Sequence, residues 1–129
     1  MKPYSILVVD DDPDFLKGII RQLEKKFSDI RILGKMSGEE ALKTMESMEV
    51  GILLSDLRMP GISGHELLEK ALVLNPRLCA VMITGYATVE SAVQALKTGA
   101  WDFITKPVER QALYHTVEKA MDHYDLVRE

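Results

Sequence analysis

The sequence predicts an α/β domain in which helices cover both faces of a five-stranded parallel sheet. Apolar runs without polar interruption, such as residues 6–9 and 51–54, are typical of parallel strands that are buried on both faces. Segments with apolar residues at helical spacing lie between such runs, so that strands and helices alternate through five units. Short connections and right-handed crossovers then predict a doubly wound α/β sandwich.

The first two units fill the beginning of the chain. A strand at about residues 5–10 precedes a helix with Asp12 as its N-cap and a proline as its first residue. The apolar stripe of this helix comprises Phe15, Leu16, Ile19, Ile20, Leu23 and Phe27. A second strand at residues 30–33 is expected to end at Gly34. The next helix begins after Ser37, which has a glutamate three residues further on, as in a capping box.

The third unit contains the strand at residues 51–55, which delivers Asp56 to a loop broken by proline and glycine. A helix follows Ser63, again with capping-box spacing, and ends at Asn75, which precedes a proline.

The last two units complete the sheet. A strand at residues 79–84 precedes a helix at about residues 88–98, which Gly99 is expected to end. The side chains expected to face inward from that helix are Val89, Ala92, Val93 and Leu96. A short strand at residues 103–105 leads to a final helix that starts near residue 109 and carries Leu113, Val117 and Met121 at a spacing of four.

Composition limits the classes of function. The chain has 129 residues, enough for one domain, and a net charge of −4, which gives no support for nucleic-acid binding by this segment. No apolar run approaches the roughly 20 residues that a membrane helix needs, and no signal-peptide pattern follows Met1. The single cysteine, Cys79, cannot form an internal disulfide. We therefore expect a cytoplasmic protein with no contact with a membrane.

Polar side chains follow four of the predicted strands, at the edge where parallel strands end. Asp10 and Asp11 follow the first strand, Asp56 the third, Thr84 ends the fourth and Lys106 follows the fifth. Each alone has an ordinary explanation as a helix cap, loop carboxylate, strand-end hydroxyl or surface lysine. Together they predict a site, because crowded carboxylates repel one another unless a cation such as Mg²⁺ relieves the repulsion. An aspartate beside Mg²⁺ can attack phosphorus, with the threonine and lysine stabilising the transferred group.

Four motifs together resemble the receiver domain of bacterial two-component response regulators. They are Ile6-Leu7-Val8-Val9-Asp10-Asp11-Asp12, Asp56-Leu57-Arg58-Met59-Pro60-Gly61 with Gly64, Met82-Ile83-Thr84-Gly85, and Lys106-Pro107. The resemblance covers about residues 4–121. It implies a flavodoxin-like sheet with strand order 2-1-3-4-5, an order for which a member of this family is a standard example.

The resemblance also implies a role for each site residue. Asp56 resembles the phosphoacceptor, and Asp11, Asp56 and the backbone carbonyl of Arg58 would bind Mg²⁺ directly, with Asp10 acting through water. Thr84 would bond a phosphoryl oxygen, and Lys106, before a cis proline bond, would pair with the phosphate. Phe103 matches the aromatic switch position.

Further expectations concern regulation. The positions of Arg58 and Tyr86 flank the path of the attacking water in this family, so both are expected to control a slow self-dephosphorylation. The switched surface would extend from helix 88–98 to the last helix, at about residues 88–121, and serve a partner or a homodimer.

The run from Met82 to Ala92 and the segment 99–103 are most similar to receivers of sigma-54-dependent, NtrC-type activators. The resemblance implies a sensor histidine kinase as partner and, in a longer protein, ATPase and DNA-binding output domains that control transcription. Residues 1–122 would form the receiver domain, and residues 123–129 the end of the last helix or the start of a linker.

The sequence also leaves three alternative functions to consider. A Mg²⁺-dependent phosphohydrolase with an aspartyl nucleophile would carry a D-x-D pattern on its first strand, which residues 10–12 satisfy, but it would need a capping insertion that this chain lacks. A flavin carrier would need a phosphate-binding loop where this sequence has acidic residues. A receiver that acts as a scaffold without phosphorylation would not need the complete acidic set.

Overall fold

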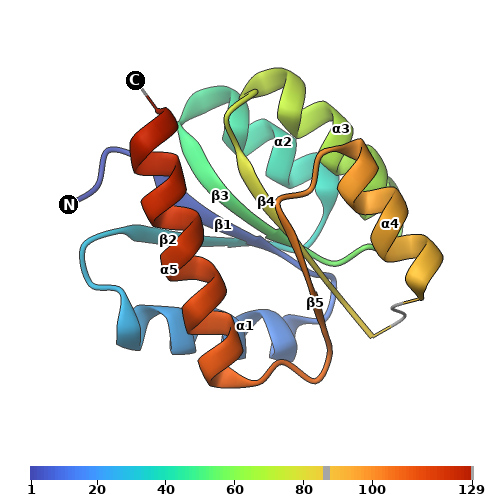
Figure 1. The fold of residues 1–129 in the computed structure, drawn as a ribbon, viewed down its shortest axis with the longest axis horizontal. Coiled ribbons are helices and arrows are strands. Elements are labelled where there is room, and N and C mark those ends of the chain that lie inside the picture. Colours follow the sequence, from blue (N-terminus) through green and yellow to red (C-terminus); the bar gives the residue numbers. More distant parts are fainter. Residues whose placement is uncertain (86–87, 129) are drawn as a thin grey trace.

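The computed structural model describes residues 1–85 and 88–128, in which five strands alternate with five helices (Figure 1). The strands are β1 (Ser5–Val9), β2 (Arg31–Lys35), β3 (Val50–Ser55), β4 (Cys79–Thr84) and β5 (Asp102–Thr105). The helices are α1 (Pro13–Lys26), α2 (Gly38–Ser47), α3 (Gly64–Leu74), α4 (Val89–Thr98) and α5 (Arg110–Val127).

The five strands form one parallel sheet in the order β2-β1-β3-β4-β5. Helices α1 and α5 cover one face of the sheet, and α2, α3 and α4 cover the other (Figure 1). The predicted doubly wound, flavodoxin-like fold and its strand order are therefore confirmed. None of the described helices combines the length and the apolar composition that crossing a bilayer requires.

The apolar strands are unbroken because each contributes to two cores. Ile6 and Val8 of β1 pack in the cluster under α1 and α5, whereas Leu7 and Val9 pack in the cluster under α2, α3 and α4. Successive side chains point to opposite faces of a strand, so burial of both faces requires apolar residues at consecutive positions. We call the cluster under α1 and α5 the first core cluster. Cys79 lies in it, and burial raises the pKa of its thiol to about 11.

The predicted end of the second strand at Gly34 is wrong, since β2 continues through Gly34 to Lys35. A Cβ atom at Gly34 would lie 2.5 Å from Cδ1 of Ile20 and 3.3 Å from Cδ1 of Leu16. Glycine at this position therefore permits the close approach of α1 to β2 rather than a turn. The first strand also ends one residue earlier than expected, at Val9.

The predicted orientation of the fourth helix is wrong as well. Val89, Val93 and Leu96 are 81%, 44% and 50% exposed, whereas Ala95 is fully buried. Apolar periodicity identifies residues that share a face of a helix but does not tell which face is buried when two faces are apolar. Here the helix packs through a small residue, and its larger aliphatic side chains face outward.

The predicted helix starts are confirmed. The side chain of Asp12 accepts hydrogen bonds from the backbone N–H groups of Asp14 and Phe15. Ser37 and Ser63 cap α2 and α3 by accepting from the N–H three residues further on. A reciprocal capping box that the sequence analysis did not identify, between Thr88 and Ser91, starts α4.

The end of α5 is held against the N-terminal edge of the sheet. Tyr124 is 2% exposed and packs edge-on against Tyr4, with ring centroids 4.5 Å apart. Arg128 forms two 2.8 Å hydrogen bonds with the carboxylate of Glu49. The last turns of α5 thus pack against the sheet. The division of the chain after residue 122, with residues 123–129 as the end of the helix or the start of a linker, remains a prediction.

Candidate functional site

Backbone hydrogen bonds continue the sheet one residue past the strands and fix the backbone of three site residues. The N–H of Asp10 donates to the carbonyl of Lys35 at 3.2 Å, and the N–H of Asp56 donates to that of Val9 at 3.1 Å. The N–H of Lys106 donates to the carbonyl of Thr84 at 3.0 Å. The side chains of these residues therefore project from a hydrogen-bonded end of the sheet, although they lie in loop segments.

Three carboxylates converge at this edge. One oxygen from each of Asp10, Asp11 and Asp56 lies within 4.8 Å of the other two. Asp10 is 2% exposed and Asp56 9% exposed, whereas Asp11 is exposed to solvent. Burial raises the pKa of the Asp10 carboxyl above its ordinary value, and hydrogen bonds from Asp12 N–H and from Lys106 offset this only in part. The predicted convergence of these aspartates is observed.

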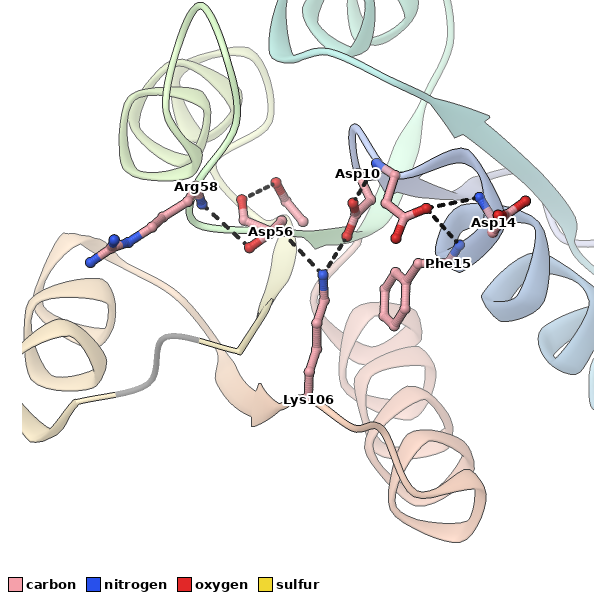
Figure 2. Close-up of polar contacts among 8 residues, drawn as sticks. Asp10, Asp14, Phe15, Asp56, Arg58 and Lys106 are labelled. Carbon is pink, nitrogen blue, oxygen red and sulfur yellow. Dashed lines mark hydrogen bonds and ion pairs between the residues drawn. The ribbon is translucent and has the colours of Figure 1, made fainter.

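Lys106 bridges two of the carboxylates. Its Nζ lies 2.9 Å from Oδ2 of Asp10 and 3.3 Å from Oδ2 of Asp56 (Figure 2). Partial burial lowers the pKa of the ammonium, but the hydrogen bond to Asp10 and the charges of Asp10 and Asp56 raise it by more, so the pKa lies above its ordinary value. The Lys106–Pro107 peptide bond is cis, as expected.

The loop that carries Asp56 packs directly against the start of α3. The N–H of Gly64 donates to the carbonyl of Leu57 at 2.9 Å, and a Cβ at Gly64 would lie 2.2 Å from the backbone oxygen of Asp56. The backbone N–H of Arg58 donates to Oδ1 of Asp56 at 3.3 Å, which orients the carboxylate (Figure 2). Gly64 belongs to one of the sequence motifs, but no local pattern indicates its close contact with the backbone of Asp56.

Phe15 belongs to this site, although sequence reasoning assigned it only to the apolar stripe of α1. The ammonium of Lys106 lies 4.1 Å from the centroid of the Phe15 ring (Figure 2). The helical spacing of Phe15 indicated packing, and the ring does pack against the first core cluster. No signal within the local sequence pairs it with a residue that follows the fifth strand.

Of the other predicted residues, Thr84 lies at the expected edge of the sheet. Thr84, the last residue of β4, is fully buried, and its backbone carbonyl is bonded to Lys106. Phe103 pairs with Met82 in the sheet and packs, partly buried, against the cluster under α2, α3 and α4. The side chain of Arg58 is exposed, and Tyr86 lies outside the described residues.

The donor set fits a hard divalent cation. Mg²⁺ prefers a few carboxylates together with waters and phosphate oxygens. Asp10, Asp11 and Asp56 supply three carboxylates at one edge, with an exposed member that leaves the cluster open to solvent. Lys106 compensates only part of their negative charge. The residues present therefore agree with the sequence-based expectation of a Mg²⁺ site.

We expect Mg²⁺ to raise the thermal stability of the protein. A ligand that binds only the folded state stabilises it by about 1.4 kcal/mol at ten times its dissociation constant, which corresponds to a rise of several degrees in Tm. A thermal melt recorded across a MgCl₂ titration measures this effect, with NaCl at matched ionic strength as the control.

Asp11→Asn should weaken the Mg²⁺ effect most, because its exposed carboxylate is the one that lacks the Lys106 ion pair. Asp14→Asn, on an exposed residue outside the three-carboxylate cluster, is the matched substitution. A melting temperature that does not respond to millimolar Mg²⁺ would contradict a metal site here.

A family model for the response regulator receiver domain matches residues 6–118. The C4-dicarboxylate transport transcriptional regulatory protein DctD of Rhizobium meliloti is 36% identical over 125 residues, which cover 97% of this chain and 27% of DctD. This chain therefore spans about a quarter of the length of that relative.

Solved structures of receiver domains have the same fold as this chain. A CheY-like response regulator receiver domain protein from Methanospirillum hungatei superposes with a TM-score of 0.87 at 32% identity, covering 96% of this chain and 98% of that one. NtrX from Brucella abortus gives a TM-score of 0.89 at 29% identity, covering 98% of this chain and 29% of NtrX.

Proposed function

Because the chain belongs to the family of response regulator receiver domains, we propose that it is a phosphorylation-controlled switch in which Asp56 accepts a phosphoryl group from a sensor histidine kinase. The observation that carries the proposal is the joint geometry of the buried carboxylates and the lysine. Asp56 lies with Asp10 and Asp11 in one cluster, and Lys106 bridges Asp10 and Asp56.

The transfer requires a nucleophile that the fold holds still. An oxygen of Asp56 attacks the phosphorus of the donor and forms a mixed anhydride. The bond between phosphorus and the histidine nitrogen of the kinase breaks, and that nitrogen keeps the electron pair. A proton on the other nitrogen of the same ring makes the leaving imidazole neutral. The backbone N–H of Arg58 donates to Oδ1 of Asp56 and leaves Oδ2 on the side of Lys106. This orientation limits the motion of the nucleophile before attack.

Other side chains stabilise the transferred group. The ammonium of Lys106 would exchange its ion pair with the carboxylate of Asp56 for one with the phosphoryl oxygens. The hydroxyl of Thr84 would donate a hydrogen bond to one of these phosphoryl oxygens. Asp10, Asp11, Asp56 and the backbone carbonyl of Arg58 would hold Mg²⁺, with Asp10 acting through water. Bound there, Mg²⁺ would neutralise negative charge on the phosphoryl oxygens.

The proposed function can be tested without the kinase. We expect the protein to gain the mass of one phosphoryl group when it is incubated with Mg²⁺ and acetyl phosphate, as measured by intact mass spectrometry. EDTA should prevent the gain. A protein that stays unmodified with Mg²⁺ and acetyl phosphate, while another receiver domain in the same reaction is modified, would contradict phosphoacceptor function.

The relatives of this chain support a role in the control of transcription. DctD is a transcriptional regulatory protein about four times as long as this chain. NtrX is also longer than this chain, which covers 29% of it. We infer that this receiver acts within an NtrC-type activator, where ATPase and DNA-binding domains control transcription. The exposed Val89, Val93 and Leu96 of α4 support use of the α4–β5–α5 surface for a partner or a homodimer.

We expect the phosphoryl mimic beryllofluoride, added with Mg²⁺, to change the environment of Phe103 and of α4. A phosphoryl group adds about −1.5 to −2 charge, so the hydroxyl of Thr84 should move toward it. The partly buried Phe103 would then turn into the space behind β4. Backbone NMR shifts compared with and without the mimic measure the change. Shifts confined to the carboxylate cluster would contradict this switch.

A further inference from the structure

We propose that Phe15 is a positioning residue for Lys106, and that the face of its ring holds the ammonium at Asp56 for contact with the phosphoryl group. The inference rests on the proposed function, since it assigns a second partner to the lysine that pairs with the phosphate. It concerns Phe15 in the first turn of α1, whose ring lies beside the ammonium of Lys106, the residue that follows β5 (Figure 2).

The geometry encloses the ammonium. Its Nζ lies 2.9 Å and 3.3 Å from oxygens of Asp10 and Asp56, and 4.1 Å from the centroid of the Phe15 ring. The side chain of Lys106 is 24% exposed. Two carboxylates and one ring therefore surround most of a group that is usually free in solvent.

The ring is itself held in place. Phe15 packs against the first core cluster, and its backbone N–H is bonded to the carboxylate of Asp12 at the helix start. The ring therefore presents a fixed surface to Lys106. Because packing already holds the ring, no further conformational entropy of Phe15 is lost when a phosphoryl group binds.

The electrostatics of the ring explain why an aromatic residue differs from an aliphatic one of similar volume. The face of a phenyl ring carries partial negative charge and attracts a cation within about 6 Å of its centroid, more strongly when the cation is partly desolvated. A lysine has a flexible four-carbon stem that allows many positions of its charge. The ring favours those positions in which the charge remains beside Asp56.

Beryllofluoride binding at saturating Mg²⁺ tests the inference. Phe15→Leu and Phe15→Met keep an apolar side chain but remove the ring, and each should raise the dissociation constant of beryllofluoride by about twofold to tenfold. Phe15→Tyr keeps the ring face and should restore most of the affinity. The matched control is Ile20→Val, which alters another partly buried α1 side chain that packs on the same core cluster and should leave the affinity unchanged.

A double-mutant cycle separates action through the lysine from a general effect on structure. Lys106→Ala alone should weaken beryllofluoride binding, and Phe15→Leu should have no further effect in that background. The Mg²⁺ affinity and Tm of Phe15→Leu show whether the fold and the carboxylates are intact, and Phe15→Met replaces it if it does not fold.

The results of these binding experiments distinguish the role of Phe15 from the proposed phosphoacceptor function. Equal weakening by Phe15→Leu with and without Lys106, or parent-like affinity in both Phe15→Leu and Phe15→Met, would overturn the role of Phe15 and leave phosphoacceptor function standing. A parent protein that binds no beryllofluoride with Mg²⁺ would overturn both.

Discussion

Asp56→Asn should abolish phosphorylation by acetyl phosphate, with no mass gain under conditions that modify the parent fully. Asparagine keeps the shape of the side chain, but its amide lacks the anionic oxygen that attacks phosphorus. The substitution also removes one of the three carboxylates of the cluster. Intact mass spectrometry measures the loss, and peptide mapping of the parent should place the label on Asp56.

Asp12→Asn is the matched control for this substitution. It removes a neighbouring aspartate whose carboxylate caps α1 and lies outside the three-carboxylate cluster. Asparagine is an equally good N-cap, so this variant should be phosphorylated like the parent. An Asp56→Asn protein that gained the same mass as the parent, with the label at another residue, would show that the assignment of Asp56 is wrong.

Gly64→Ala should destabilise the protein by about 3 kcal/mol or more. The added methyl group would lie 2.2 Å from the backbone oxygen of Asp56 and 2.6 Å from Cα of Leu57. Both contacts are with backbone, which cannot turn aside as a flexible side chain can. Either α3 or the Asp56 loop must move, so we also expect weaker Mg²⁺ binding. Urea unfolding measured by circular dichroism gives the change in the free energy of unfolding.

Gly18→Ala provides the comparison in a second helix. Gly18 lies inside α1, and a Cβ atom there would have no neighbour within 4 Å. Alanine should therefore stabilise the protein by up to about 1 kcal/mol through helix propensity and lower chain entropy. If both substitutions changed stability in the same direction and by similar amounts, steric contact at Gly64 would not be the cause.

The fold was predictable because its signals are local. Uninterrupted apolar strands, helix caps at Asp12, Ser37 and Ser63, and the carboxylates after β1 and β3 all lie within short segments of sequence. They were sufficient to predict the doubly wound sheet and, with the motif resemblance, the family. The polar residues meet at one edge because parallel strands end together.

The features that were missed depend on contacts between distant segments. Gly34 reads as a strand end until the packing of Ile20 against it is known. The outward orientation of Val89 and Leu96 depends on which face of α4 meets its neighbours. The pairing of Phe15 with Lys106 joins the first helix to the segment after the last strand, and no local pattern encodes such a contact.

The carboxylate cluster and its lysine also have a consequence for the order of events. As ions, three carboxylates and one ammonium carry a net charge of minus two. A divalent cation cancels this charge, whereas Na⁺ or K⁺ would leave a negative remainder beside the buried Asp10 and Asp56, where uncompensated charge is costly. In the proposed transfer, the incoming phosphoryl donor is itself an anion, and the site would repel it without the cation. For the proposed transfer, the charge of the site therefore favours a doubly charged ion over a singly charged one and favours its binding before the phosphoryl donor.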